Sequence, residues 1–159
     1  MTFSGFPVEA LDFYEDLEAD NTKTFWNRHR SVYDECVRGP MLALCDELAP
    51  RFGDPHVYRP YRDLRFSRDR TPYKDHQGAT VGEFYVQVSA AGLAAGAGYY
   101  QMSPDQLSRY RDAVDDDATG GALAKVAAEL RAEGYTIGGD RLKTRPRGYD
   151  ADHRRSRLP

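Results

Sequence analysis

The sequence predicts one α+β domain, with N-terminal helices, a central and mainly antiparallel sheet of about four strands, and further helices packed on it. Three observations lead to this fold class. Apolar residues recur at helical spacing through the first fifty residues, alternate with polar residues from 54 to about 101, and return to helical spacing after Ser103. A chain of 159 residues has the usual length of one domain, so we expect a single domain over 1–159.

The first fifty residues are expected to form three helices. Pro7 suits the first turn of the first helix, and Asn21 ends that helix and offers an N-cap for the second. The second helix keeps one apolar face until Gly39-Pro40, where the third begins and continues to Pro50. The positions that define the three faces are Ala10, Phe13, Tyr14 and Leu17, then Phe25, Trp26, His29, Val32, Tyr33, Cys36 and Val37, and finally Met41, Leu44, Cys45 and Leu48.

Four strands are expected between residues 54 and 101. The first, over 58–66, would present two different faces because side chains alternate along a strand. Leu64 and Phe66 would share one face with Arg62, and the other face would carry Tyr61, Asp63, Arg65 and Ser67. The other strands are expected over 74–81, 83–89 and 93–100, with turns at 71–72 and 90–92.

Helices return after the sheet. Ser103 and Gln106 form a capping-box pattern, with Pro104 at the first helical position. A further helix is expected to stop at Gly134, where glycine suits the position after a helix end. The tail from Ile137 is glycine-rich and then basic, which is typical of an edge strand or an ordered loop.

Composition narrows the class of protein. The net charge is −3, so the chain as a whole does not attract nucleic acid or anionic membranes. No apolar stretch approaches the roughly 18 residues of a membrane span, and the N-terminus has no secretory pattern. The two cysteines, Cys36 and Cys45, lie in apolar helical patterns without disulfide or zinc-ligand spacing. We therefore expect a cytoplasmic protein that does not associate with membranes.

Residues 59–76 concentrate basic side chains in an otherwise acidic chain. The segment holds six basic residues, but only Asp63, Asp69 and Asp75 as counter-charges. Arginine donors match phosphate and carboxylate geometry, so the surplus predicts a site for an anionic, phosphate-bearing small molecule. A second basic segment, at 143–150, would close over the same site. The predicted ligand-binding residues are Arg59, Tyr61, Arg62, Arg65, Ser67, Lys74, Arg145 and Arg147.

Other interpretations of the same residues stay open. The arginines could form internal ion pairs or bind an acidic partner, as in a non-catalytic interaction or scaffold protein. If the protein is an enzyme, which the sequence does not decide, His76 and Asp63 are the candidate catalytic residues. Nucleic acid is a weaker candidate partner because the chain is acidic overall. No metal-ligand spacing is present, and neither a cofactor nor an oligomeric state is indicated.

Four segments resemble a known bacterial family: FSGFPVEALDFYEDLEADNTKTFWNRHR, RPYRDLRFSRDRTPYKDH, EFYVQVSAAGL and RPRGYDADH. This is the Domain of Unknown Function 2461 family, and the resemblance extends from Phe3 to His153. It implies a conserved intracellular α+β domain and carries over no reaction, cofactor or partner. Family members usually continue beyond the segment that resembles residues 145–153, so a C-terminus shortened relative to the family is also implied.

Overall fold

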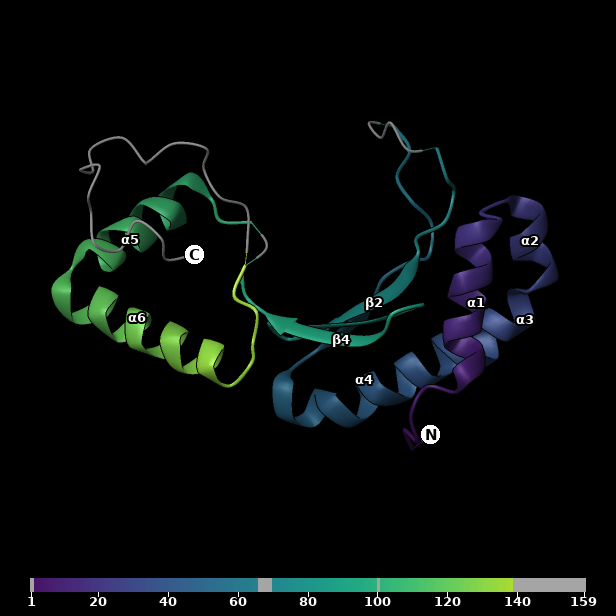
Figure 1. Ribbon diagram of the computed structural model, residues 1–159, viewed down its shortest axis with the longest axis horizontal. Helices are drawn as coiled ribbons and strands as arrows, with labels where there is room; N and C mark the ends of the chain where they lie inside the picture. The colour runs from purple at the N-terminus through teal and green to yellow at the C-terminus, as the bar shows by residue number, and fades with distance from the viewer. Residues whose placement is uncertain (1, 66–69, 100, 139–159) are drawn as a thin grey trace. The chain divides into compact units, whose positions relative to one another are not determined.

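The computed structural model describes residues 2–65, 70–99 and 101–138 (Figure 1). Contacts within the chain group it into two compact units, Met1–Tyr99 and Tyr100–Pro159. Helices and a four-stranded antiparallel sheet confirm the predicted α+β class. The single domain expected over 1–159 stays a prediction.

The first unit begins with helices. They are α1 (Val8–Ala19), α2 (Lys23–Arg28), α3 (Arg30–Val32), the π-helix η1 (Tyr33–Arg38) and α4 (Gly39–Phe52). The third helix was expected to begin at Gly39-Pro40, and α4 does begin at Gly39, although the backbone stays helical from η1 into it. Pro40 is the second residue of α4, and its missing N–H removes one hydrogen bond to the preceding turn at the junction with η1. The helix also passes Pro50 and ends where Gly53 takes a φ of +110°.

We expected Asn21 to cap α2, but it does not. Thr22 does so instead, because its hydroxyl oxygen accepts a hydrogen bond from the Phe25 N–H at 3.1 Å. This frees the Asn21 side chain for a contact with Tyr73, far along the chain.

The sheet has the strand order β1-β2-β3-β4, with every neighbouring pair antiparallel. Its strands are β1 (Pro55–Val57), β2 (His76–Val81), β3 (Phe84–Ser89) and β4 (Gly92–Ala97). The three strands expected over 74–81, 83–89 and 93–100 are therefore confirmed, with β2 starting two residues later and β4 ending three residues earlier.

The strand expected over 58–66 was wrong over the residues that the structure describes. Beyond β1, this stretch keeps one isolated bridge, between Tyr61 and Tyr73. The Arg62 N–H donates to the Pro72 carbonyl and the Lys74 N–H donates to the Pro60 carbonyl. Neither proline nitrogen can donate in return, so the ladder does not extend into a regular strand.

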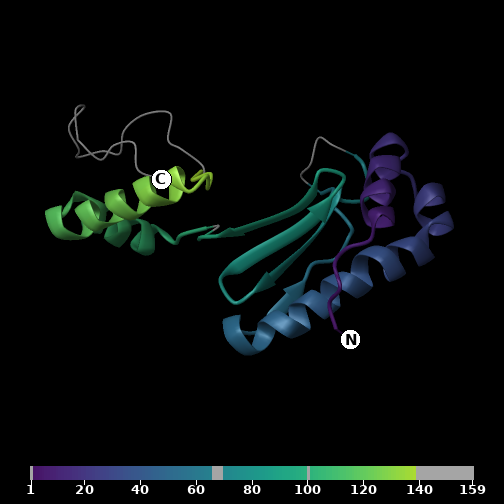
Figure 2. The ribbon, with the colours of Figure 1, turned by 60° about the horizontal axis from the view of Figure 1, so that its bottom comes forward.

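The core of the first unit lies between one face of the sheet and the helices. Figures 1 and 2 show α4 running along that face. The sheet contributes Gln77, Ala79, Val81, Val86 and Val88, and the helices contribute an apolar and aromatic set that includes Phe13, Tyr14, Leu17, Trp26, Tyr33, Val37 and Met41. Burial of these side chains holds the sheet against the helices.

In its described part, residues 101–138, the second unit contains two helices that pack against each other, α5 (Pro104–Asp115) and α6 (Asp117–Ala132). The predicted capping box is confirmed, because Ser103 and Gln106 exchange both of its hydrogen bonds. Gly134 has a φ of +93° just after α6, as expected for a glycine that follows a helix end. Packing of these helices on the sheet stays a prediction. None of the described helices combines the length and apolar character needed to cross a membrane.

Gly82 should tolerate no side chain. It lies in the turn between β2 and β3 with a φ of +57°, and an added Cβ would clash with the Phe52 carbonyl oxygen. We expect Gly82→Ala to lower the free energy of unfolding by about 2 kcal/mol or more, measured by urea denaturation. Gly96→Ala is the control, because nothing lies within 4 Å of its added Cβ, and it should change stability by less than about 1 kcal/mol. Equal losses in the two variants would contradict this account.

Candidate functional site

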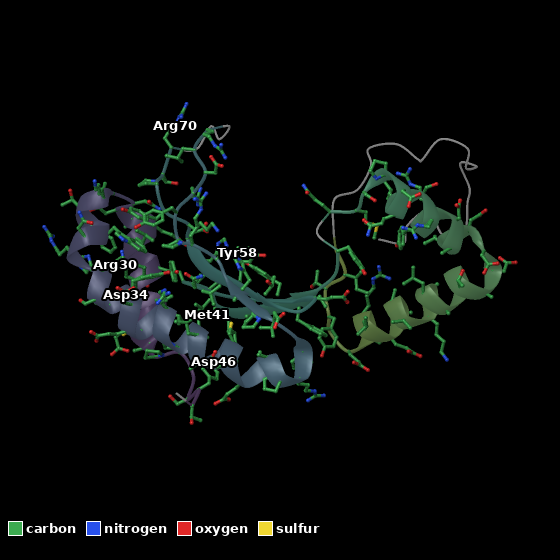
Figure 3. All side chains as sticks on the ribbon, turned by 180° about the vertical axis from the view of Figure 1, so that it is seen from behind. Arg30, Asp34, Met41, Asp46, Tyr58 and Arg70 are labelled. Atoms are coloured by element: carbon green, nitrogen blue, oxygen red, sulfur yellow. The ribbon has the colours of Figure 1, made fainter. Side chains whose placement is uncertain are left out.

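The candidate site lies on the sheet face that points away from α1 and α4. His76, Gly78 and Thr80 of β2 lie opposite Ser89, Gln87 and Tyr85 of β3. Because side chains alternate, these residues point away from the core positions Gln77, Ala79 and Val81. We call this side the outer face and define it by His56, Tyr58, Lys74, His76, Thr80, Tyr85 and Gln87. Figure 3 shows Tyr58 on this side of the sheet and Met41 of α4 on the other.

Aromatic rings form the centre of the outer face. The Tyr58 ring lies 4.8 Å from His56 at 80° and 6.4 Å from Tyr85, measured between centroids. Tyr85 occupies the space above Gly78, where any Cβ would meet its ring. The Tyr85 hydroxyl donates to Gln87 Oε1 at 2.9 Å. The absence of a side chain at Gly78 therefore lets an aromatic ring lie against the strand.

One cation, Lys74, lies beside these rings. Lys74 Nζ is 5.4 Å from the centroid of the Tyr58 ring, within the range of a cation–π contact. Burial lowers the pKa of Lys74, and the positive charge of Arg59 lowers it further. Arg59 is exposed, and neither it nor Lys74 forms an ion pair with a carboxylate in the part of the chain that the structure describes. Lys74 on the outer face and Arg59 near it thus carry like charges.

His76 is held by the residue that precedes it. Its Nδ1 lies 2.7 Å from Asp75 Oδ1, and the Arg62 guanidinium lies 3.5 Å from the other carboxylate oxygen. Burial alone would raise the pKa of Asp75, but the hydrogen bond from His76 and the charges of His76 and Arg62 outweigh it, so the pKa is lowered. An ionised Asp75 accepts the Nδ1–H, so Nε2 is the ring nitrogen of His76 that Asp75 does not contact.

Asp63, the other candidate catalytic residue, is bound to Arg65. The Arg65 Nε donates to Asp63 Oδ1 at 2.9 Å and its Nη2 to Oδ2 at 2.5 Å, and both side chains are exposed. Hydrogen bonds from the Arg65 side chain and backbone lower the pKa of Asp63 well below its usual range. Asp63 is therefore an ionised acceptor at neutral pH and does not donate a proton.

Tyr61, another predicted site residue, does not lie on the outer face. The Tyr61 ring lies 6.1 Å from Trp26 and 5.4 Å from Tyr73, on the side of the helices, and its hydroxyl interacts with Arg30. Ser67, Arg145 and Arg147 lie outside the described residues. The structure thus groups Arg59 with Lys74 and Arg62 with His76, and it separates Tyr61 from them. Tyr58, Tyr85 and Gln87 were not among the predicted site residues.

Contacts with the helices fix the strand that carries Lys74 and His76. The Asn21 amide accepts from the Tyr73 N–H and donates to the Tyr73 carbonyl, both at 3.1 Å. The Tyr73 ring also stacks on Trp26, with centroids 4.2 Å apart and planes 7° apart. Lys74 therefore follows directly after a residue that is held both by its backbone and by its ring.

Gln77 provides a second anchor in the core. Its Oε1 accepts from the Tyr33 hydroxyl at 2.5 Å, and its amide nitrogen donates to the carbonyls of Tyr58 and Gly78 at 2.7 and 2.8 Å. Burial raises the pKa of Tyr33 to about 12, so the phenol keeps its proton and donates. The buried amide thereby fixes the backbone of Tyr58 from the core side of the sheet.

No described group of three or more His, Cys, Asp and Glu side chains is arranged to hold a metal ion. The fold and site define an α+β protein in which basic and aromatic side chains share one face of an antiparallel sheet. The chain belongs to the family of conserved hypothetical proteins DUF2461, whose sequence model matches residues 9–158. Comparison with curated proteins found no match, and comparison with solved structures found none either.

Replacing Asn21 should destabilise the first unit. Asn21→Ala would leave both backbone groups of Tyr73 without their partner, so we expect a loss of about 1–3 kcal/mol in the free energy of unfolding. Fluorescence of Trp26, the one tryptophan in the chain, follows the transition in urea. Asn27→Ala on α2 is the matched control, because Asn27 is exposed, and it should stay within about 0.5 kcal/mol of wild type. A loss of the same size in both variants would contradict the anchoring role.

Asp75 should make stability depend on acid pH. Its pKa is lower in the folded state than the usual value of about 3.9, so its stabilising contribution is present above that value and is lost as pH falls through the folded pKa. Asp75→Asn should therefore lower the free energy of unfolding near neutral pH, with the difference from wild type shrinking below about pH 4. Because Asp75 is half exposed, we expect a difference of under about 1 kcal/mol.

Urea titrations across this pH range measure the effect of Asp75→Asn. The same substitution in a His76→Gln background is the control, because part of the effect should disappear when the hydrogen-bond donor is absent. A difference that does not change with pH would contradict the proposed ionisation.

Proposed function

We propose that the outer face binds an anionic, phosphate-bearing ligand through Arg59 and Lys74. The observation that carries this proposal is the position of Lys74, which lies 5.4 Å from the Tyr58 ring and has no carboxylate partner among the described residues. Its pKa is lowered first by burial and then by the positive charge of Arg59. A bound phosphate would offset the repulsion between them and accept hydrogen bonds from both. Such a ligand is common in the cytoplasm of bacteria, where we propose that the protein acts.

The neighbouring residues take secondary roles in this proposal. Arg62 is half-buried and contacts Asp75, so it contributes charge at the edge of the site. If the protein catalyses a reaction, His76 is the proton-transfer group, because Asp75 orients its ring. Asp63 is excluded from that role by its pairing with Arg65. Tyr61, whose ring lies beside Trp26, takes no part in this proposal. Ser67, Arg145 and Arg147 stay part of it on sequence grounds.

A scaffold or interaction protein is the second candidate. The ion pairs Arg65–Asp63 and Arg62–Asp75 favour it, because they use part of the basic segment internally. Exposed pairs of this kind contribute roughly 0–1 kcal/mol each, so they do not require a ligand to explain them. In this case Arg59 and Lys74 would contact an acidic protein surface instead of a small molecule.

Thermal unfolding in the presence of phosphate and sugar phosphates tests the proposal. At low salt, wild type should gain a saturable increase in Tm, equivalent to about 2.7 kcal/mol when the ligand is at one hundred times its Kd. Arg59→Gln and Lys74→Gln should each abolish most of that gain, because each removes one of the two charges. Their Tm without ligand should stay equal to wild type or rise, since the repulsion is relieved.

Arg28→Gln is the charge-matched control. Arg28 is an exposed residue in the last turn of α2, so its removal should leave the ligand-induced increase in Tm unchanged. No saturable response to any of the phosphates would reject the ligand site. In that case, a specific acidic protein partner lost in Arg59→Gln would support the scaffold.

A further inference from the structure

We propose that the ligand of the outer face is a nucleotide, with its base stacked on Tyr58 beside Tyr85 and its phosphate against Arg59 and Lys74. This inference rests on the proposed phosphate site and adds the base to it. The observation behind it is that the charged and aromatic parts of the face lie next to each other. Lys74 Nζ is 5.4 Å from the Tyr58 ring centroid.

The aromatic part of the face is accessible. Tyr58 keeps 36% of its surface exposed. Its backbone is held without its hydroxyl, because the Gln77 side-chain amide donates to the Tyr58 carbonyl and the Tyr58 N–H donates to the Gly78 carbonyl. Stacking on tyrosine is the usual way in which sheet surfaces bind nucleobases, because every base offers a flat π-face. An exposed ring on a fixed backbone gives such a platform without requiring the strands to move.

The charged part suits a phosphate attached to a stacked base. A sugar phosphate without a base would use Arg59 and Lys74 but would leave the Tyr58 ring unused. In a nucleotide, one sugar separates the base from the phosphate, and the short distance between Lys74 and the Tyr58 ring fits so compact a ligand. Arg59 adds a second positive charge, which acts on Lys74. Two positive charges suit a phosphate group that carries two negative charges.

Gln87 offers a hydrogen-bonding group next to the rings. Its Oε1 accepts from the Tyr85 hydroxyl. This contact does not use the two N–H donors of the Gln87 amide. Among the described residues no acceptor is bound to that amide nitrogen, so it is available to a ring nitrogen or carbonyl of a base. Stacking, charge and one amide donor are thus collected on neighbouring strands.

The site does not distinguish a free nucleotide from a nucleotide within a single strand, because both present the same base and phosphate. Calorimetric titration of the whole chain at low salt with adenosine monophosphate, ribose 5-phosphate and a short deoxyadenosine oligonucleotide separates these cases. We expect adenosine monophosphate to bind about ten-fold more tightly than ribose 5-phosphate, because stacking of one base on an aromatic ring adds binding free energy of that order. Tighter binding of the oligonucleotide would identify a strand as the source, and equal or weaker binding would identify the free nucleotide.

Variants at Tyr58 give the decisive comparison. Tyr58→Leu should reduce the affinity for adenosine monophosphate to that for ribose 5-phosphate, and Tyr58→Phe should keep it near wild type because the ring remains. Tyr135→Leu is the control, as it removes a tyrosine that is 62% exposed in the second unit and should change neither affinity. Circular dichroism checks that Tyr58→Leu is folded, and Tyr85→Leu provides a second test if it is not.

The outcomes separate the nucleotide inference from the phosphate site. Equal affinity for adenosine monophosphate and ribose 5-phosphate, or an unchanged affinity in Tyr58→Leu, would overturn the nucleotide and leave the phosphate site intact. Failure of all three compounds to bind would reject both. Loss of binding in Arg59→Gln together with the Tyr58→Leu result would support both.

Discussion

The buried amide of Gln77 joins the helices to the candidate site. It accepts from Tyr33 on the helical side and donates to the Tyr58 and Gly78 carbonyls on the side of the strands. A buried amide that loses a partner costs about 1–3 kcal/mol, so these groups must keep their relative positions whenever the protein is folded. The ring of Tyr58 on the outer face is therefore positioned by hydrogen bonds in the core. Helix packing and the geometry of the site depend on the same side chain.

Much of the fold was predictable because its signals are local. The capping box at Ser103 and the alternation in 84–89 depend only on residues a few positions apart, and both were predicted correctly. The errors arose at positions whose structure depends on a residue far away in the sequence. Asn21 has the side chain of a helix cap, but it binds the Tyr73 backbone from 52 residues away. The strand expected over 58–66 fails because two prolines meet across the bridge, a pairing that only the register reveals.

The site was predictable in its charge and less so in its aromatic part. The basic residues of 59–76 identified Arg59, Lys74 and His76, because surplus charge is visible in composition. Tyr85 and Gln87 alternate with Val86 and Val88, a period of two that could have placed them on a polar face, but no sequence signal places that face beside Tyr58. Cross-strand pairing of β1, β2 and β3 does so. The contact of the Tyr61 ring with Trp26 likewise depends on a residue far along the chain.

Lys74 couples the stability of the fold to occupation of the site. Its lowered pKa means that the folded state holds the proton less tightly than the unfolded chain does, so at neutral pH the charged lysine opposes folding. The ion pairs of Arg62 and Arg65 offer no relief, since their carboxylates are already engaged. Moving Lys74 into water would remove the cost, but Tyr73 before it and Asp75 after it are held by their own contacts. An anion beside Lys74 and Arg59 would favour the charged form and reverse the sign of this contribution. The same two charges that reduce the stability of the empty protein would then increase that of the complex.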